Sequence, residues 1–144
     1  MPHSLGFRVG VGLVRIALGV LFAYAAVAKL PDPIGFAEDV ANFRMLPAGW
    51  VSPVTAMLPG LELTLGALLI VGVFVRAAAL LTAGLLSVFT LALTQALSRG
   101  VDLNCGCFGT SVAEPATVWT VARDVALIAV AIVIATFDPR ATLK

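Results

Sequence analysis

Four long apolar stretches are the feature that most constrains the fold of this 144-residue chain. They cover about residues 9–28, 53–75, 77–98 and 118–137. A helix needs roughly 20 apolar residues to cross the hydrocarbon core of a bilayer, and each stretch reaches that length. The chain is 60% hydrophobic and only 12% charged, which excludes a water-soluble domain. The sequence therefore predicts an all-α polytopic membrane protein, with one four-transmembrane-helix bundle forming a single domain over residues 1–144.

The first stretch has a competing interpretation as a secretory signal peptide. Arg8 would be its charged start, and Ala26-Val27-Ala28 resembles a small-residue cleavage site. Arg15 interrupts the apolar run, which is not typical of a signal peptide, so a first membrane helix is favoured.

Residues 30–51, between the first two stretches, differ in kind. Asp32 followed by Pro33 is typical of a helix N-cap with proline in the first turn. Apolar side chains then recur at helical spacing on one side: Phe36, Val40 and Phe43. We expect a short interfacial helix, which either covers the bundle as a lid in the headgroup plane or packs on its rim as an amphipathic connector.

Four spans place both termini and a tight turn at Arg76 on one side of the membrane. Residues 30–51 and the loop over residues 99–116 then lie on the other side, together with Trp50 and Trp119, where interfacial aromatics are expected. Basic residues near the span ends number four on the terminal side and three on the other, which favours cytoplasmic termini. We expect a multi-pass protein of the bacterial inner (cytoplasmic) membrane, with the loop extracytoplasmic.

The only two cysteines, Cys105 and Cys107, lie in that loop with Gly106 between them. A disulfide requires Cα atoms about 4.4–6.8 Å apart, so a bridge across one residue needs the backbone to fold back. Gly106 and Gly109 permit such a turn. A bridge over so short a loop is strained, and strained disulfides are the labile and catalytic ones. We predict thiol–disulfide exchange at this pair, which requires an oxidising, extracytoplasmic compartment.

Two other interpretations of the cysteine pair stay open. In one, the thiols are incidental and the protein is a non-catalytic membrane scaffold; in the other, they bind a soft metal such as Cu(I) or Zn. His3, the only histidine, lies at the opposite end of the chain, and no further cysteine completes a tetrahedral zinc set. Under the redox interpretation, Arg99 and Lys29 are the nearest candidates for lowering a thiol pKa, because a nearby cation favours the thiolate. The formal net charge of +1 predicts no nucleic-acid partner.

Four charged residues fall inside the apolar stretches: Arg15, Glu62, Arg123 and Asp124. An unpaired charge near the centre of a membrane helix costs about 2.5–3.5 kcal/mol on insertion scales, so these groups should pair. We predict that Glu62 faces the bundle interior and pairs with Arg15 or Arg123 first, and with Lys29 second. This intramembrane polar network is either structural or a pocket beneath the cysteine loop that binds a partner or a quinone-like electron acceptor.

Several stretches together resemble one known family. They are Arg15-Ile16-Ala17-Leu18-Gly19 leading to Ala28-Lys29-Leu30, Asp32-Pro33 with Phe36, Asn42-Phe43-Arg44-Met45-Leu46-Pro47, Leu58-Pro59-Gly60-Leu61-Glu62 with Gly66, and Asn104-Cys105-Gly106-Cys107-Phe108-Gly109. From about Arg15 to about Asp124, the chain is similar to the MauE/DoxX family of redox-associated four-helix membrane proteins. The Cys-Gly-Cys-Phe-Gly element is the most specific part of this resemblance.

The resemblance implies a four-helix bundle and a role in disulfide handling. In the methylamine-utilisation branch, the membrane protein is needed to mature a disulfide-rich periplasmic dehydrogenase subunit beside a thioredoxin-like partner. It therefore implies that Cys105 and Cys107 act on a thioredoxin-like protein or a disulfide-containing client, with Gly106, Phe108 and Gly109 in support.

The overall plan is also similar to vitamin K epoxide reductase, a four-helix thiol protein that relays electrons to a quinone. This chain departs from that plan, because it has one cysteine pair and no Cys-x-x-Cys motif. The departure argues against a complete internal relay from the loop to a quinone.

Overall fold

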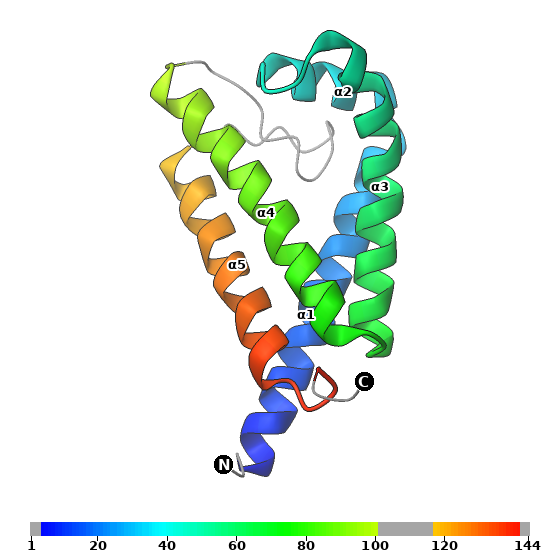
Figure 1. The fold of residues 1–144 in the computed structure, drawn as a ribbon, viewed down its shortest axis with the longest axis vertical. Helices are drawn as coiled ribbons and strands as arrows, with labels where there is room; N and C mark the ends of the chain where they lie inside the picture. Colours follow the sequence, from blue (N-terminus) through cyan, green and yellow to red (C-terminus); the bar gives the residue numbers. More distant parts are fainter. Residues whose placement is uncertain (1–3, 101–116, 142–144) are drawn as a thin grey trace.

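The structure is a computed structural model in which residues 4–100 and 117–141 are described. The described chain consists of helices α1 (Leu5–Lys29), α2 (Pro33–Asn42), α3 (Ala48–Val71), α4 (Val75–Ser98) and α5 (Val118–Phe137). All but α2 are long and apolar enough to cross a membrane. They form an elongated bundle, and α2 lies across one end of it (Figure 1). The predicted all-α four-span fold, with a short helix between the first two spans, is confirmed.

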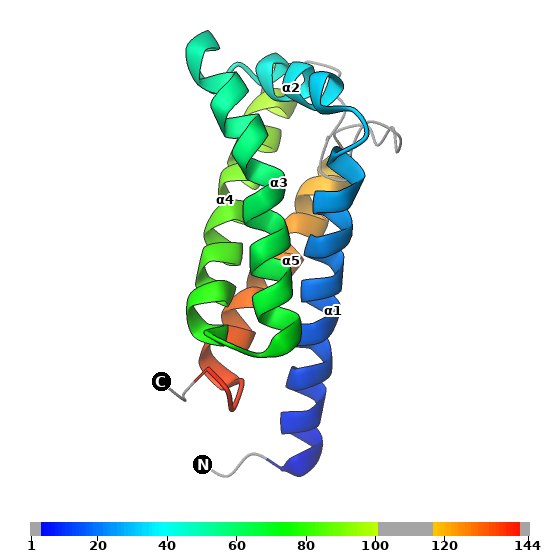
Figure 2. The ribbon, with the colours of Figure 1, turned by 90° about the vertical axis from the view of Figure 1, so that its right-hand side faces the viewer.

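The two ends of the bundle carry different elements. Both described termini and the turn between α3 and α4 lie at one end, whereas α2, the end of α4 and the start of α5 lie at the other (Figures 1 and 2). This is the arrangement that four spans predict. The predicted cysteine site, residues 105–109, lies outside the described residues.

The structure shifts the predicted bounds of α3, which begins at Ala48 rather than residue 53 and ends at Val71 rather than residue 75. Gly72 ends the helix in a left-handed conformation with φ of 82°, which glycine adopts without steric cost, and its N–H donates to the carbonyl of Leu68. The turn therefore lies before Val75, and Arg76 belongs to α4.

The core lies between the four spans, where α1 packs mainly along α3 and α4 along α5. Fully buried apolar side chains at its centre include Leu69, Ala79, Ala131 and Ile134. The backbones of α1 and α3 lie close together at Gly19 and Gly66, where a Cβ on Gly66 would lie 2.7 Å from the Gly19 carbonyl oxygen. Small residues allow such close approach between membrane helices, so this contact fixes α1 against α3.

Helix α2 begins as predicted, with Pro33 in its first turn and the Asp32 side chain accepting a hydrogen bond from the Gly35 N–H at 2.9 Å. Two aromatic side chains point into the protein: Phe36 of α2 and Phe43, the residue after its last turn, are only 2% and 8% exposed. Phe43 packs in a cluster with Leu93 and Ala96 of α4. The apolar side of α2 is therefore a packing face that closes the end of the bundle.

Candidate functional site

A buried ion pair joins Lys29, the last residue of α1, to Glu62 in α3. The Lys29 Nζ atom lies 2.8 Å from Oε1 and 2.6 Å from Oε2 of Glu62, and the two side chains are 0% and 5% exposed. The prediction that Glu62 faces the interior and pairs with a cation is confirmed. Its partner within the described chain is Lys29, which the sequence placed second, and not Arg15 or Arg123, which it placed first.

The direction of side chains on a helix explains why Lys29 is the partner. A Cα–Cβ bond points toward the N-terminus of its helix, so Lys29 reaches back along α1 into the bundle. Glu62 lies one turn from Gly66 toward the end where α1 finishes, within reach of that lysine. The Arg15 side chain points toward the same N-terminal end of α1, but Glu62 lies on the other side of Arg15, so this side chain extends away from Glu62.

Arg15 belongs to a second charged cluster at the opposite end of the bundle. Its Nε atom lies 3.1 Å from Oδ2 of Asp138, and its Nη1 donates to the carbonyl of Leu69. Arg140 adds a hydrogen bond from Nη1 to the carbonyl of Val71 at 2.9 Å. The expectation that Arg15 meets Glu62 is therefore wrong. Asp138, the residue that directly follows α5, is the counter-ion, and the sequence analysis did not identify it. The signal that could have found it is Arg15, a charge within an apolar run that needs a carboxylate partner.

Phe36 connects α2 to the Lys29–Glu62 pair. The Lys29 Nζ atom lies 5.4 Å from the centroid of the Phe36 ring, within the range of a cation–π attraction. Lys29 is thus engaged by a carboxylate and a ring, and its effect on a thiol pKa stays a prediction because both cysteines lie outside the described residues. Arg99, the other predicted candidate, is exposed at the end of α4.

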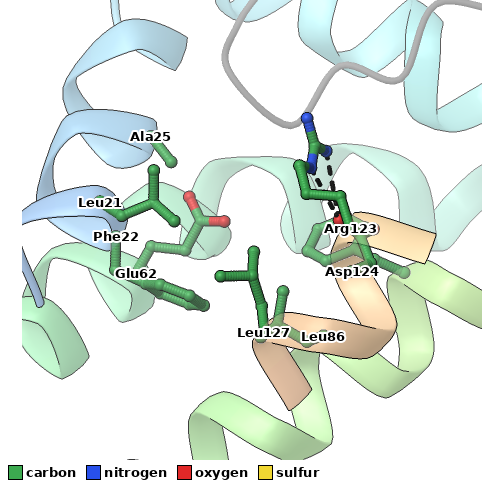
Figure 3. Close-up of a pocket in the computed structure, with 9 residues that line it drawn as sticks. Leu21, Phe22, Ala25, Glu62, Leu86, Arg123, Asp124 and Leu127 are labelled. Atoms are coloured by element: carbon green, nitrogen blue, oxygen red, sulfur yellow. Dashed lines mark hydrogen bonds and ion pairs between the residues drawn. The ribbon is translucent and has the colours of Figure 1, made fainter. Parts of the chain in front are cut away.

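A small pocket beside Glu62 brings together three of the four predicted intramembrane charges: Glu62, Arg123 and Asp124. Figure 3 shows the Glu62 carboxylate on one side of the pocket and Arg123 and Asp124 on the other. Arg123 Nη2 lies 3.2 Å from Asp124 Oδ1, and the Asp124 residue is 1% exposed. The volume of about 30 Å³ has room for about one water molecule. The pocket can therefore hold a water molecule between these charged side chains, but it is too small for an organic ligand.

The described residues contain no group of three or more histidine, cysteine, aspartate or glutamate side chains placed to hold a metal ion. Cys105 and Cys107 lie outside the residues to which this statement applies.

Comparison with known proteins identifies the family. The family model described as methylamine utilisation protein MauE matches residues 8–137. The methylamine utilization protein MauE of Paracoccus denitrificans is 37% identical over 129 residues, which cover 89% of this chain and 69% of that protein, and the Paracoccus versutus protein gives the same values. The Methylophilus methylotrophus protein of that name is 34% identical over 91 residues, covering 62% of this chain and 48% of the relative. No solved structure gives a significant match. The chain therefore belongs to the MauE family.

Proposed function

We propose that this protein is a thiol–disulfide exchange protein of the bacterial inner membrane that serves methylamine utilisation. Cys105 and Cys107 exchange a disulfide with a thioredoxin-like protein or with an extracytoplasmic client. Support comes from the relatives, whose printed names assign them to methylamine utilisation, and from the matched region, residues 8–137, which includes both cysteines.

The observation that carries this proposal is the position of the helix ends on either side of the cysteine segment. Helix α4 ends at Ser98 and α5 begins at Val118, both at the end of the bundle that carries α2 (Figure 1). The two helix ends therefore lie at one end of the bundle, which is where a protein partner can approach. Trp50 and Trp119 are 63% and 79% exposed at the same end, as interfacial aromatics are.

Hydrogen bonds and side-chain packing hold both helix ends in place. The Thr117 hydroxyl accepts a hydrogen bond from the Thr120 N–H at 3.3 Å, and the Thr120 hydroxyl accepts one from the Thr117 N–H at 3.4 Å. This reciprocal capping fixes the first turn of α5. Near the end of α4, Leu93 and Ala96 pack against Phe43, the residue that follows α2.

The exchange conserves sulfur–sulfur bonds, electrons and protons. A thiolate of the client attacks one sulfur of the Cys105–Cys107 disulfide, that bond breaks, and the other cysteine leaves as a thiolate. A second client thiolate then attacks the mixed disulfide, so the client becomes oxidised and the cysteine pair is reduced, with the two protons passing from client thiols to the pair. Strain in a bridge across one residue favours this direction.

Serine replacement of both thiols tests the proposal in cells that depend on this gene for growth on methylamine. The Cys105→Ser/Cys107→Ser variant should reach the membrane at the normal level, while the disulfide-rich dehydrogenase subunit accumulates with free thiols that alkylating reagents modify. Full maturation of that subunit by the double variant would instead establish a scaffold without thiol chemistry. Copper or zinc in the purified protein, lost in the double variant, would establish the metal-binding alternative.

A further inference from the structure

A second, larger cavity lies beneath α2, against α3 and α4. Its volume is about 360 Å³, which falls in the range of about 300–1,000 Å³ that small-ligand sites occupy. The walls are apolar and aromatic, with Phe36 from α2, Phe43 just after α2, Leu58 from α3 and Phe89 from α4. Such walls accept an apolar ring or chain rather than a charged soluble metabolite.

Asp39 is the one polar residue among the described residues that line this cavity. It follows Phe36 by three positions and precedes Phe43 by four, so helical geometry turns it to the side of α2 that carries both rings. Its Oδ2 atom is buried and has no hydrogen-bond partner within the described part of the chain. A buried polar atom without a partner is costly, so a ligand that hydrogen-bonds to Asp39 would be stabilised there.

The charges near Asp39 select against anionic ligands. Burial raises the pKa of the Asp39 carboxyl, and the charges of Asp32 and Glu38 raise it further. A fatty-acid carboxylate or a phospholipid phosphate would add another negative charge at this place. A carboxyl group accepts hydrogen bonds when ionised and donates one when protonated, so Asp39 complements an uncharged oxygen that itself gains and loses a proton.

The cavity is reached from the bilayer. Val88, on the membrane-spanning helix α4, lines it and is 61% exposed, and Met45 lines it and is 44% exposed. The exposed surface of a membrane span faces lipid, so a ligand that enters past Val88 is dissolved in the membrane.

We propose that the cavity beneath α2 binds the ring of a membrane quinone, with a ring oxygen at Asp39 and the isoprenoid tail leaving toward lipid past Val88. Phe89 lines both this cavity and the small pocket that holds Glu62, Arg123 and Asp124, so the ring lies next to the charged centre of the bundle.

This inference deepens the proposed function, and the transfer of electrons to the quinone rests on the proposed thiol chemistry. Oxidation of the Cys105 and Cys107 thiols to a disulfide releases two electrons and two protons, and a quinone that takes up both becomes the hydroquinone. Binding of the ring, in contrast, involves only the described residues.

Photoaffinity labelling of the full-length protein in quinone-free phosphatidylcholine nanodiscs tests this site. An azido derivative of decylubiquinone is crosslinked, the labelled peptides are mapped, and decylubiquinone is titrated as competitor to give an apparent Kd. Label in α2 or α4 peptides is expected. Asp39→Leu should weaken binding about tenfold, since it removes the hydrogen bond that the protonated Asp39 carboxyl donates to a carbonyl oxygen of the quinone ring. The matched Glu38→Leu, on the exposed side of α2 and outside the cavity lining, should stay within about twofold.

Ala92→Phe, which fills the cavity from α4, should abolish the saturable label. If that variant does not show a cooperative thermal transition, Val54→Phe fills the same cavity from α3. Unchanged affinity in a folded cavity-filling variant, or equal competition by farnesol or palmitate, would overturn the proposal. Binding should persist in Cys105→Ser/Cys107→Ser, so a failure of the thiol function is distinguished from a failure of the quinone site.

Discussion

The ammonium nitrogen of Lys29 lies 2.6 Å from Oε2 of Glu62, and this contact joins the last turn of α1 to α3 inside the apolar bundle. The Phe36 ring of α2 lies beside the same nitrogen. One buried ion pair, together with the Phe36 ring, therefore connects α1, α2 and α3 at the end of the bundle that carries α2.

Glu62→Leu should lower the free energy of unfolding by about 3–5 kcal/mol, because it leaves the Lys29 charge buried and unpaired. Lys29→Met/Glu62→Leu should recover much of that loss, since no unpaired charge remains. Denaturant unfolding in lipid nanodiscs measures both, with the exposed Glu38→Leu as control. A Glu62→Leu protein as stable as the parent would contradict a structural role for the pair.

Gly66→Ala should destabilise the bundle by about 1–3 kcal/mol through overpacking. The new Cβ would lie 2.7 Å from the Gly19 carbonyl oxygen and 2.9 Å from the Ala23 backbone nitrogen, and backbone atoms cannot move aside without separating α1 from α3. Gly84→Ala is the matched control in α4, where a Cβ meets nothing within 4 Å, and it should stabilise by up to about 1 kcal/mol. Equal shifts in Tm for the two variants would show that the glycine contact does not limit helix packing.

Asp39→Asn should raise Tm at pH 7. The pKa of Asp39 is raised above its ordinary value of 3.8 in the folded protein, mainly by burial, so its ionised form disfavours folding. This penalty is full above the raised pKa and disappears as the pH falls through it toward 3.8. The Tm difference between variant and parent should therefore shrink on acidification. A Tm difference between Asp39→Asn and the parent that grows at low pH would contradict a raised pKa of Asp39 in the folded protein.

Sequence patterns predicted the elements of the fold but not the pairing of its charges. Apolar length identified the spans, and Asp32-Pro33 identified the start of α2, because these signals are local. The partner of Glu62 depends on the register between α1 and α3, which the close contact of Gly19 with Gly66 sets and hydropathy does not reveal. The partner of Arg15 depends on where α5 ends beside α1. Asp39 was not singled out from the sequence, although its spacing from Phe36 and Phe43 allowed a place beside them.

The proposed topology predicts that Cys105 and Cys107 react from outside the cytoplasm. They are the only cysteines in the chain, so a membrane-impermeant maleimide added to spheroplasts after mild reduction would report on this segment alone. Labelling should occur without permeabilisation and be absent from Cys105→Ser/Cys107→Ser. Labelling that requires permeabilisation would place the segment in the cytoplasm and exclude the proposed exchange with an extracytoplasmic client.

Trapping of a mixed disulfide tests the central claim most directly. In Cys105→Ser and Cys107→Ser, the remaining thiol can bond to a partner, but the second cysteine that would resolve the bond is gone. At least one variant should accumulate a reductant-sensitive adduct on non-reducing gels, and mass spectrometry should identify a cysteine of a thioredoxin-fold protein or of the client in it. If neither variant forms such an adduct and both still support client maturation, thiol–disulfide exchange at this pair is contradicted.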